Sequence, residues 1–289
     1  MDKNRDILSI LEEKNINLDM FILLIFENYQ RRKKEGNLYS KYDYVPQNII
    51  KAYYSEIDKP RFDSLVNKFK LDYIKNENAI EDVHEKSERK GLEEIYNYIH
   101  NETNINNISI YTILKLHQLM YSKSPHPEFG GMFRNQPIFL PNSGVETADW
   151  SILPKRFSEL YEPTQKLIKK GITLSNNNNT SNIDKIIEYI DECVELNCTL
   201  IKMHPFYDGN GRTIRAFTNL LFIIANIPPI YIKKREKEEY GKVMNLALVE
   251  GDLSQIKRFY YYKICDSIYE LDIKPKLSAE VDQSVTKKF

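Results

Sequence analysis

The chain has 289 residues, of which 42% are hydrophobic and 28% are charged. This length is ample for one large domain or for a core domain with an appendage, and the composition is typical of a globular protein. Lys plus Arg and Asp plus Glu balance at 41 each. A chain without a basic excess does not have the usual character of a nucleic-acid or membrane-surface binder, so we expect neither as a partner, although a local basic pocket remains compatible with this balance.

The first stretch, MDKNRDILSILEEKN, contains acidic residues and no long apolar core, so it does not resemble a signal peptide. The longest apolar stretches, residues 20–26 and 220–232, are too short or too interrupted by Pro to span a bilayer. We therefore expect a cytoplasmic protein.

Three cysteines, an odd number, fit a reducing compartment: Cys193, Cys198 and Cys265. Two of them, with His204, could be imagined as zinc ligands, but their spacing matches no standard zinc site. Buried free thiols are the expected alternative.

Apolar residues recur at helical spacing along most of the chain, and alternation with a period of two is scarce, which predicts a mainly α fold. Residues 1–74 are predicted to be an N-terminal helical extension, residues 75–271 the main domain, and residues 272–289 a polar tail. Within the main domain the predicted helices span residues 80–100, 108–122, 150–171, 183–203, 209–226, 235–248 and 253–270.

One segment breaks this helical pattern. Residues 125–144 contain clusters of Gly and Pro around the short run MFRNQPIFL, which predicts a small β-hairpin, or flap, at about residues 131–140. Arg134 within it is interpreted either as a contact for phosphate or a target, or equally as a solvated charge.

The stretch HPFYDGNGRTIR, residues 204–215, is unusually dense in reactive side chains. Gly209 and Gly211 bracket Asn210 where a helix is predicted to begin, and the first amides of a helix have no partner within it. Without side chains at the two glycines, phosphate oxygens can approach those amides closely. Arg212 and Arg215 lie on one face of the helix and can bind a polyphosphate through charge-assisted hydrogen bonds.

Three further residues of this stretch have distinct expected roles. The carboxylate of Asp208 is a suitable Mg²⁺ ligand beside bound phosphates. His204 has a reference pKa near neutrality and can accept a proton from an attacking hydroxyl. Phe206 is expected to anchor the turn in the core. A base, a metal ligand and anion-binding groups together predict phosphoryl or nucleotidyl transfer, while a polar turn with a surface arginine pair is the simpler alternative.

These residues resemble the signature of the Fic family, HxFx[DE]GNGRxxR, at every specified position. The resemblance extends over about residues 75–270 through the apolar helix before the motif, the helix after it, the flap GGMFRNQPIFLP and the pattern ALVEGDLSQIKRFY. It implies a helical bundle with a small hairpin flap. It also implies a protein adenylyltransferase, which transfers AMP from ATP to a Ser, Thr or Tyr hydroxyl of a target protein or of itself.

The same resemblance implies a role for each motif residue. His204 would be the general base, and Asp208 would hold Mg²⁺ on the α- and β-phosphates. Gly209, Asn210 and Gly211 would form the anion hole. Arg212 would bind the β-phosphate and Arg215 the γ-phosphate of ATP, and the flap would add a target segment through main-chain hydrogen bonds along a strand edge.

The segment NENAIEDVH, residues 76–84, resembles the inhibitory segment of self-restrained Fic proteins, [ST]xxxE[GN]. Glu81 aligns with its glutamate, but Glu77 replaces the Ser or Thr and Asp82 replaces the Gly or Asn. Paired with Arg215, Glu81 would occupy the group needed for the γ-phosphate. The alternatives are that Glu81 is an exposed helix acid, or that the dipeptide Glu250–Gly251 has the inhibitory role.

Other activities stay open at the level of sequence. Some Fic relatives transfer a phosphate or phosphocholine and some remove AMP, so a deAMPylase or another phosphate-ester transferase is an alternative. A non-catalytic interaction protein with a vestigial pocket is a second alternative, and a homo-oligomer that controls Glu81 is possible.

Overall fold

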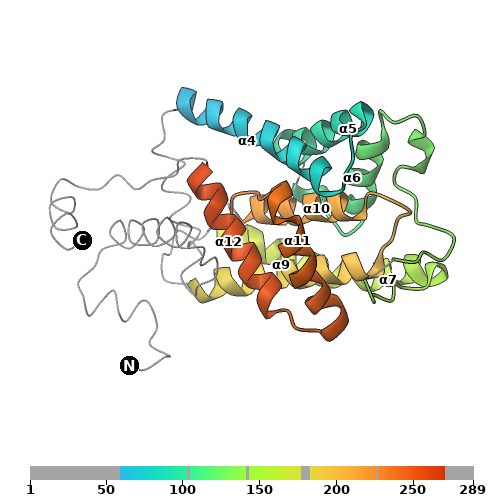
Figure 1. Cartoon of the computed structure of the whole chain (residues 1–289). Helices are drawn as coiled ribbons and strands as arrows, with labels where there is room; N and C mark the ends of the chain where they lie inside the picture. The colour runs from blue at the N-terminus through green and yellow to red at the C-terminus, as the bar shows by residue number, and fades with distance from the viewer. Residues whose placement is uncertain (1–58, 103–104, 141–142, 177–182, 226, 271–289) are drawn as a thin grey trace, which may run out of the picture.

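The computed structural model describes residues 59–102, 105–140, 143–176, 183–225 and 227–270 (Figure 1). The predicted helices before residue 59 and the predicted tail after residue 271 lie outside this range. The α-helices that it contains are α4 (Lys59–Ile80), α5 (Lys86–Asn97), α6 (Thr112–Tyr121), α7 (Leu153–Glu159), α8 (Tyr161–Asn176), α9 (Ile183–Met203), α10 (Asn210–Ile224), α11 (Lys237–Asn245) and α12 (Ser254–Glu270).

The prediction of a mainly α fold is confirmed, and several helices have the predicted bounds. α9 coincides with the predicted helix 183–203, while α10 and α12 begin and end within a few residues of their predictions. The predicted helix 150–171 is divided into the 3₁₀ turn η4 (Trp150–Ile152), α7 and α8. The predicted helix 80–100 begins only at Lys86, because residue 80 is the last residue of α4 and a turn follows it.

Helix α10 lies at the centre of the described structure. It contacts α6, α8 and α9 (Figure 1), and almost every one of its residues is buried. Its buried Asn219 is hydrogen-bonded, as burial favours: the side chain donates to the carbonyl of Ile230 and accepts from its amide, both at 2.8 Å. The helix that begins at the motif is therefore fixed on all sides.

Helix α4 ends in a turn that explains one departure from the inhibitory pattern. The amide of Asp82 donates to the carbonyl of Ala79 at 3.3 Å, and the amide of Val83 donates to that of Asn78 at 2.9 Å. This is the Schellman arrangement of a helix C-terminus, and it requires a residue with positive φ just after the cap. Asp82 has φ +55°. Gly and Asn adopt that conformation readily and Asp accepts it, so Asp82 fits the position and leaves Glu81 as the C-cap.

The predicted β-hairpin is not formed: among the described residues no strand occurs, and residues 132–140 are an extended loop. Its two arms are joined by side chains instead of a backbone ladder. A guanidinium nitrogen of Arg134 donates to the carbonyl of Ala148, and the hydroxyl of Thr147 donates to that of Ile138 at 3.3 Å. Pro137 has no amide hydrogen to give to a ladder. The segment is therefore a loop with a hairpin-like course.

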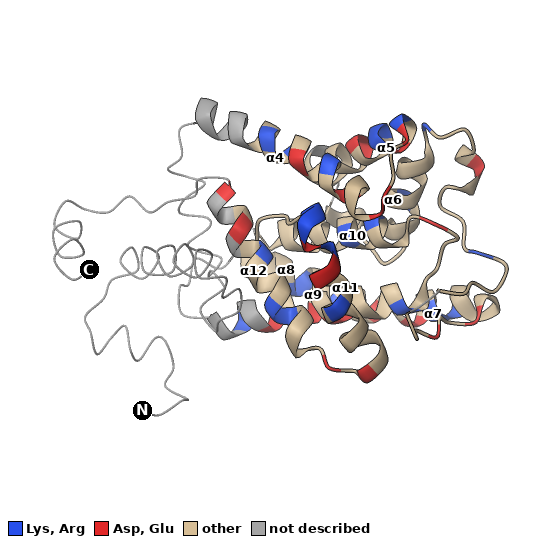
Figure 2. Cartoon of the chain, in the orientation of Figure 1, with Lys and Arg blue, Asp and Glu red and all other residues tan. Residues whose placement is uncertain are grey.

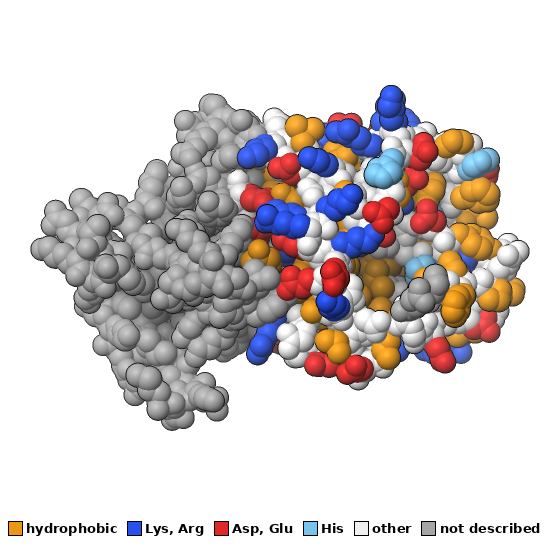
Figure 3. All heavy atoms as spheres, in the orientation of Figure 1, with side chains coloured by type: hydrophobic (Ala, Val, Ile, Leu, Met, Phe, Trp, Pro, Cys, Tyr) orange, Lys and Arg blue, Asp and Glu red, His pale blue; other side chains and the backbone are white. Residues whose placement is uncertain are grey.

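The surface and the thiols agree with the composition. Charges of both signs occur along the helices and are interspersed on the face shown in Figures 2 and 3. Cys193 and Cys198 are buried free thiols, and burial raises the pKa of Cys198 to about 12. Within the described part of the chain, no helix combines the length and the apolar character that crossing a bilayer requires.

Candidate active site

The motif forms a short loop between α9 and α10 that its own side chains hold closed. His204 follows α9 with φ +49°, an uncommon conformation for a residue with a side chain. Phe206 is fully buried, as expected. The side chain of Asn210 accepts from the Phe206 amide and donates to the Phe206 carbonyl, both at 2.9 Å. The amide group of Asn210 is thus used within the loop, which leaves only its backbone N–H available to an anion.

His117 of α6 supports this loop, and the sequence reasoning missed it. Its Nε2 lies 3.0 Å from the carbonyl oxygen of Asp208, and its Nδ1 accepts from the Gly131 amide at 2.8 Å. The ring stacks on Phe206 with centroids 3.7 Å apart. Burial lowers the pKa of His117 to about 4, so the neutral ring joins the start of the flap to the motif.

The glycines of the motif have the conformation and the space that an anion cradle requires. Gly209 is the N-cap of α10 with φ +73°, and a Cβ there would lie 2.1 Å from Cε of Met120. A Cβ on Gly211 would lie 2.4 Å from Oε1 of Glu81. The first amides of α10 have no partner within the helix and carry the positive end of its dipole. A carboxylate oxygen therefore already lies against this helix end.

Arg215, one turn into α10, contacts two carboxylates of α4. Its Nη2 donates to Oε1 of Glu81 at 2.8 Å, and its Nε donates to Oε2 of Glu77 at 2.8 Å. Burial alone would lower the pKa of Arg215, but the charges of Glu77 and Glu81 outweigh that effect and raise it. The predicted contact of Glu81 with Arg215 is present, and Glu77 is an additional partner that sequence reasoning missed.

Arg212 also has acidic and amide partners from the preceding helices. Its Nη1 donates to a carboxylate oxygen of Glu88 on α5 and, at 3.2 Å, to the side-chain carbonyl of Asn78 on α4. The side chain of Arg212 is 0% exposed. Both arginines predicted to bind phosphate are therefore neutralised by acids that precede the motif by more than a hundred residues in sequence.

His204 is in the protonation state that a general base needs. Burial lowers its pKa, and the positive charge of Arg134 lowers it further, while the charges of Asp208 and Glu81 act in the opposite direction. The net lowering keeps the imidazole neutral at neutral pH, so that it can accept a proton.

Asp208 is placed as a metal ligand would be. Its side chain is 72% exposed, and each oxygen accepts one hydrogen bond: from the Tyr121 hydroxyl at 2.9 Å and from the Gly209 amide at 2.7 Å. Carboxylate oxygens have further lone pairs to offer. Mg²⁺ commonly takes one or two protein carboxylates and completes its shell with phosphate oxygens and water. Asp208 therefore fits Mg²⁺ carried by a polyphosphate.

Arg134 has neither role expected from the sequence. Its side chain is buried, and all three of its nitrogens donate to main-chain carbonyls. Nε donates to the carbonyl of His204 at 2.7 Å, and Nη1 donates to that of Gln136 at 2.9 Å. Its backbone amide donates to the carbonyl of Pro205 at 2.9 Å. Arg134 is thus a structural residue that ties the flap loop to the backbone of the motif.

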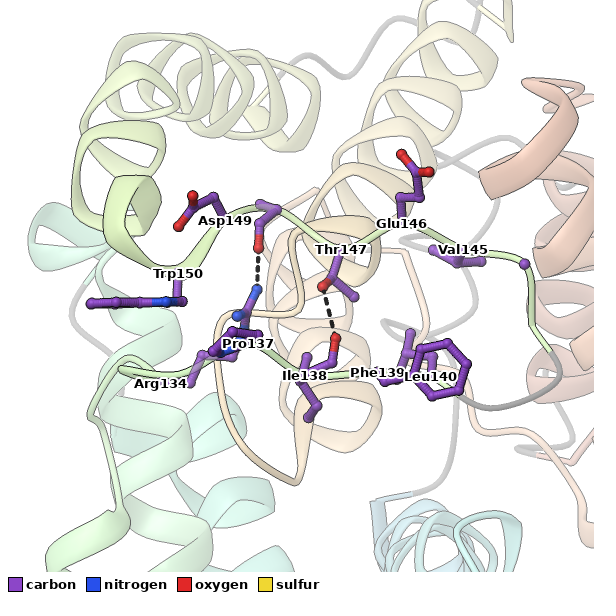
Figure 4. A pocket seen from close by; sticks show the side chains of 12 residues that line it. Arg134, Pro137, Ile138, Phe139, Leu140, Val145, Glu146, Thr147, Asp149 and Trp150 are labelled. Atoms are coloured by element: carbon purple, nitrogen blue, oxygen red, sulfur yellow. Dashed lines mark hydrogen bonds between the residues drawn. The ribbon is translucent and has the colours of Figure 1, made fainter.

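A groove of about 670 Å³ lies between the two arms of the flap loop, residues 134–140 and 144–150, and Arg134 is one of the residues that line it (Figure 4). Apolar side chains form most of its walls, and they include Ile138, Phe139, Val145 and Trp150. Phe139 is 83% exposed, although an aromatic ring is normally favoured inside. Its acidic members are Glu146 and Asp149.

The second inhibitory candidate lies elsewhere. Glu250 is an exposed residue at the end of the π-helical turn η6 (Leu246–Glu250), and Gly251 follows it with φ +75°. The carboxylates bound to Arg215 are those of Glu77 and Glu81. The geometry therefore favours Glu81 over Glu250.

Comparison with known proteins confirms the resemblance noted in the sequence. Residues 107–222 match the Fic/DOC family. The chain is 27% identical over 178 residues to a protein adenylyltransferase Fic from Nematostella vectensis, an alignment that covers 61% of this chain and 37% of that protein. It is 31% identical over 157 residues to the protein of the same name from Drosophila mojavensis, which covers 53% of this chain and 26% of that protein.

The fold agrees with the same family. A crystal structure of a Fic domain containing signaling protein from Bacteroides thetaiotaomicron superposes with a TM-score of 0.59 at 18% identity, covering 78% of this chain and 96% of that one. The helical Fic fold is thereby confirmed. The chain spans about a third or less of the length of the two curated relatives.

Proposed function

From the match of residues 107–222 to the Fic/DOC family and the intact motif within it, we propose that the chain is a protein adenylyltransferase. It transfers AMP from ATP to a hydroxyl of a target protein or of itself. The hydroxyl oxygen bonds to the α-phosphorus of ATP, the bond from that phosphorus to the bridging oxygen breaks, and pyrophosphate leaves. The observation that carries the proposal is the carboxylate of Glu81, which already occupies an anion position against Gly211 and Arg215.

Each motif residue has a task in this reaction that its geometry supports. Neutral His204 takes the proton of the attacking hydroxyl. The free amides at the start of α10 bind phosphate oxygens, and Arg212 and Arg215 bind the terminal phosphates once Glu88 and Glu81 move away. Asp208 would hold Mg²⁺, which supplies charge neutralisation on the phosphates when bound.

The same contacts support a restrained resting state. The Glu81 carboxylate blocks the cradle sterically and repels a triphosphate by like charge. The Glu81 side chain is 37% exposed, so its bond to Arg215 is partly screened. A charge-assisted hydrogen bond discounted in this way is worth about 1–2 kcal/mol, and an equilibrium of that size leaves roughly 3–15% of the molecules open. Basal transfer is therefore expected to be low and measurable.

The proposal is tested by intact-mass measurement after incubation with ATP and Mg²⁺. Glu81→Gly is expected to add one adenylate unit to itself or to a hydroxyl-bearing target roughly six- to thirtyfold faster than the parent, because the roughly 3–15% of molecules that are open become nearly all. Asp82→Gly is the matched control: Asp82 is the exposed neighbour of Glu81, and it contacts Lys237 instead of Arg215. It should behave like the parent.

Two further measurements separate the rival activities. Combining Glu81→Gly with His204→Ala should abolish transfer while the melting temperature is kept, and transfer that persists would refute His204 as the base. ATP labelled on the α- or the γ-phosphate distinguishes AMP transfer from phosphoryl transfer, and a target modified in advance tests for AMP removal. Absence of any transfer by Glu81→Gly would favour a non-catalytic protein.

We further propose that the target segment lies in the groove of the flap loop (Figure 4). Apolar side chains such as Ile138, Phe139, Val145 and Trp150 line the groove, which favours an apolar side chain in the target segment. A double substitution of Phe139 and Trp150 by Ser should raise the KM for a protein target without changing the affinity for ATP. Equal effects on both would contradict this assignment.

A further inference from the structure

Helix α4 brings two carboxylates to Arg215, and the second is unusual for this kind of site. Glu77 and Glu81 are four residues apart, so they lie on the same face of α4. Glu77 stands where the resemblance leads one to expect Ser or Thr. It donates no hydrogen bond in its charged form and brings a negative charge to a position that a hydroxyl would leave neutral.

The two carboxylates differ in their freedom to move. Glu81 is the last residue before the turn of α4, and its side chain is 37% exposed. Glu77 lies one turn inside the helix, and its side chain is 0% exposed. Rotation of the Glu81 side chain releases Arg215 from Glu81, whereas release from Glu77 requires α4 itself to shift. Arg215 therefore keeps Glu77 as a partner when Glu81 has moved away.

Resting on the function proposed above, we propose that Glu77 is a specificity residue for the nucleotide donor: as a permanent counter-ion of Arg215, it reduces recognition of the third phosphate. With Glu81 removed, Arg215 and Glu77 together still carry no net charge. The Nε of Arg215 is occupied by Glu77 at 2.8 Å, so only the terminal nitrogens face a ligand. A γ-phosphate then gains hydrogen bonds from the fork without the attraction of an uncompensated cation, which supplies much of the strength of such pairs.

The consequence concerns the class of nucleotide that the released site accepts. The α- and β-phosphates are still bound by the amides of α10, by Arg212 and through Asp208, and none of these groups contacts Glu77 in the structure. The released protein should therefore bind adenosine di- and triphosphates with similar affinity. A site with an unneutralised arginine at this position would strongly prefer the triphosphate.

The test is calorimetric titration with ATP and with ADP, both in the presence of Mg²⁺, in the Glu81→Gly background. The ratio of the Kd for ADP to the Kd for ATP is expected to lie within about threefold of unity for Glu81→Gly, and to rise to about tenfold or more on adding Glu77→Gln, the change that 1.4 kcal/mol produces. Gln keeps the shape and the acceptor oxygen of Glu77 and removes only the charge. Asp82→Asn in the same background is the matched control and should leave the ratio unchanged.

Glu77→Gln in that background leaves buried Arg215 without a carboxylate, so folding is checked by thermal unfolding. If the double variant does not fold, Glu81→Gly alone is decisive, because a preference of that variant for ATP over ADP of about tenfold or more overturns the inference. A ratio that is unchanged or lowered by substitution of Glu77 overturns the inference and indicates that Glu77 merely orients the fork. Failure of every folded variant to bind either nucleotide overturns the proposed function together with the inference. Binding with an unchanged ratio overturns only the role of Glu77.

Discussion

Replacing Arg134 by Met tests whether a buried arginine holds the flap loop against the motif. Three partly buried main-chain carbonyls, those of His204, Gln136 and Ala148, would lose their donor. A hydrogen bond contributes about 0.5–1.5 kcal/mol net, and an abandoned buried acceptor costs about 1–3 kcal/mol. Because these carbonyls are only partly buried, the lower value applies, and three such losses amount to about 1.5–4.5 kcal/mol, a large fraction of the 5–15 kcal/mol typical of a folded domain.

The free energy of unfolding is measured by urea titration of the parent, Arg134→Met and Arg134→Lys. Lys can reach some of the carbonyls with its single ammonium group and should lose less. Arg156→Met is the matched control, because Arg156 is an exposed arginine of α7 that pairs with Glu159 at 3.3 Å. Surface pairs of this kind contribute about 0–1 kcal/mol. A loss below about 1 kcal/mol for Arg134→Met would refute the structural role of Arg134, because it would mean that other donors or water serve these carbonyls.

Two further predictions concern the motif and its support. In the Glu81→Gly background, Gly211→Ala should weaken ATP binding at least roughly tenfold in calorimetry, because the new methyl group would project into the phosphate cradle; unchanged affinity would place the phosphates elsewhere. The pKa of about 4 for His117 lies below the value of about 6.5 in the unfolded chain. Between these pH values the unfolded state therefore binds more protons than the folded state. The free energy of unfolding consequently falls as the pH falls from 6.5 to 4, by about 3 kcal/mol from this group. His117→Gln should reduce that slope in urea titrations at pH 7 and pH 5, and an identical slope would contradict the neutral, buried ring.

The parts of the site that could be predicted from sequence are those in which local chain geometry decides the outcome. Glycines before an apolar helix define a helix N-terminus wherever the helix packs, so the loop from His204 to the start of α10 has the expected form. Glu81 was found through its spacing relative to a known pattern. Glu77 was treated only as a departure from that pattern, although its separation of four residues from Glu81 placed both acids on one face of a helix. That spacing was the signal that could have found it.

The residues that were missed depend on which segments meet in three dimensions. Arg134 is buried because carbonyls of the motif and of the returning arm of the loop surround its guanidinium, and neither is near it in sequence. In the sequence, His117 is one polar residue of an ordinary amphipathic helix. Only the folded structure shows that its ring stacks on Phe206. The predicted hairpin is not confirmed for a related reason: the Gly and Pro clusters are present, but side-chain donors take the place of a backbone ladder between the two arms.

The acids that make the shortest contacts with the two arginines of the motif lie outside the segment that matches the family. Residues 107–222 contain the whole motif, whereas Glu77 and Glu81 belong to the end of α4 and Glu88 belongs to α5. Asp208, whose carboxylate lies 3.8 Å from Nη2 of Arg212, is a fourth acid beside the two arginines. Four carboxylates therefore face two arginines, and this leaves a net negative charge at the proposed site for the polyphosphate. Opening the site requires these two helices to move or their acids to rotate, since α10 is packed on all sides. The proposed machinery for transfer and the proposed restraint on it thus lie in separate parts of the chain.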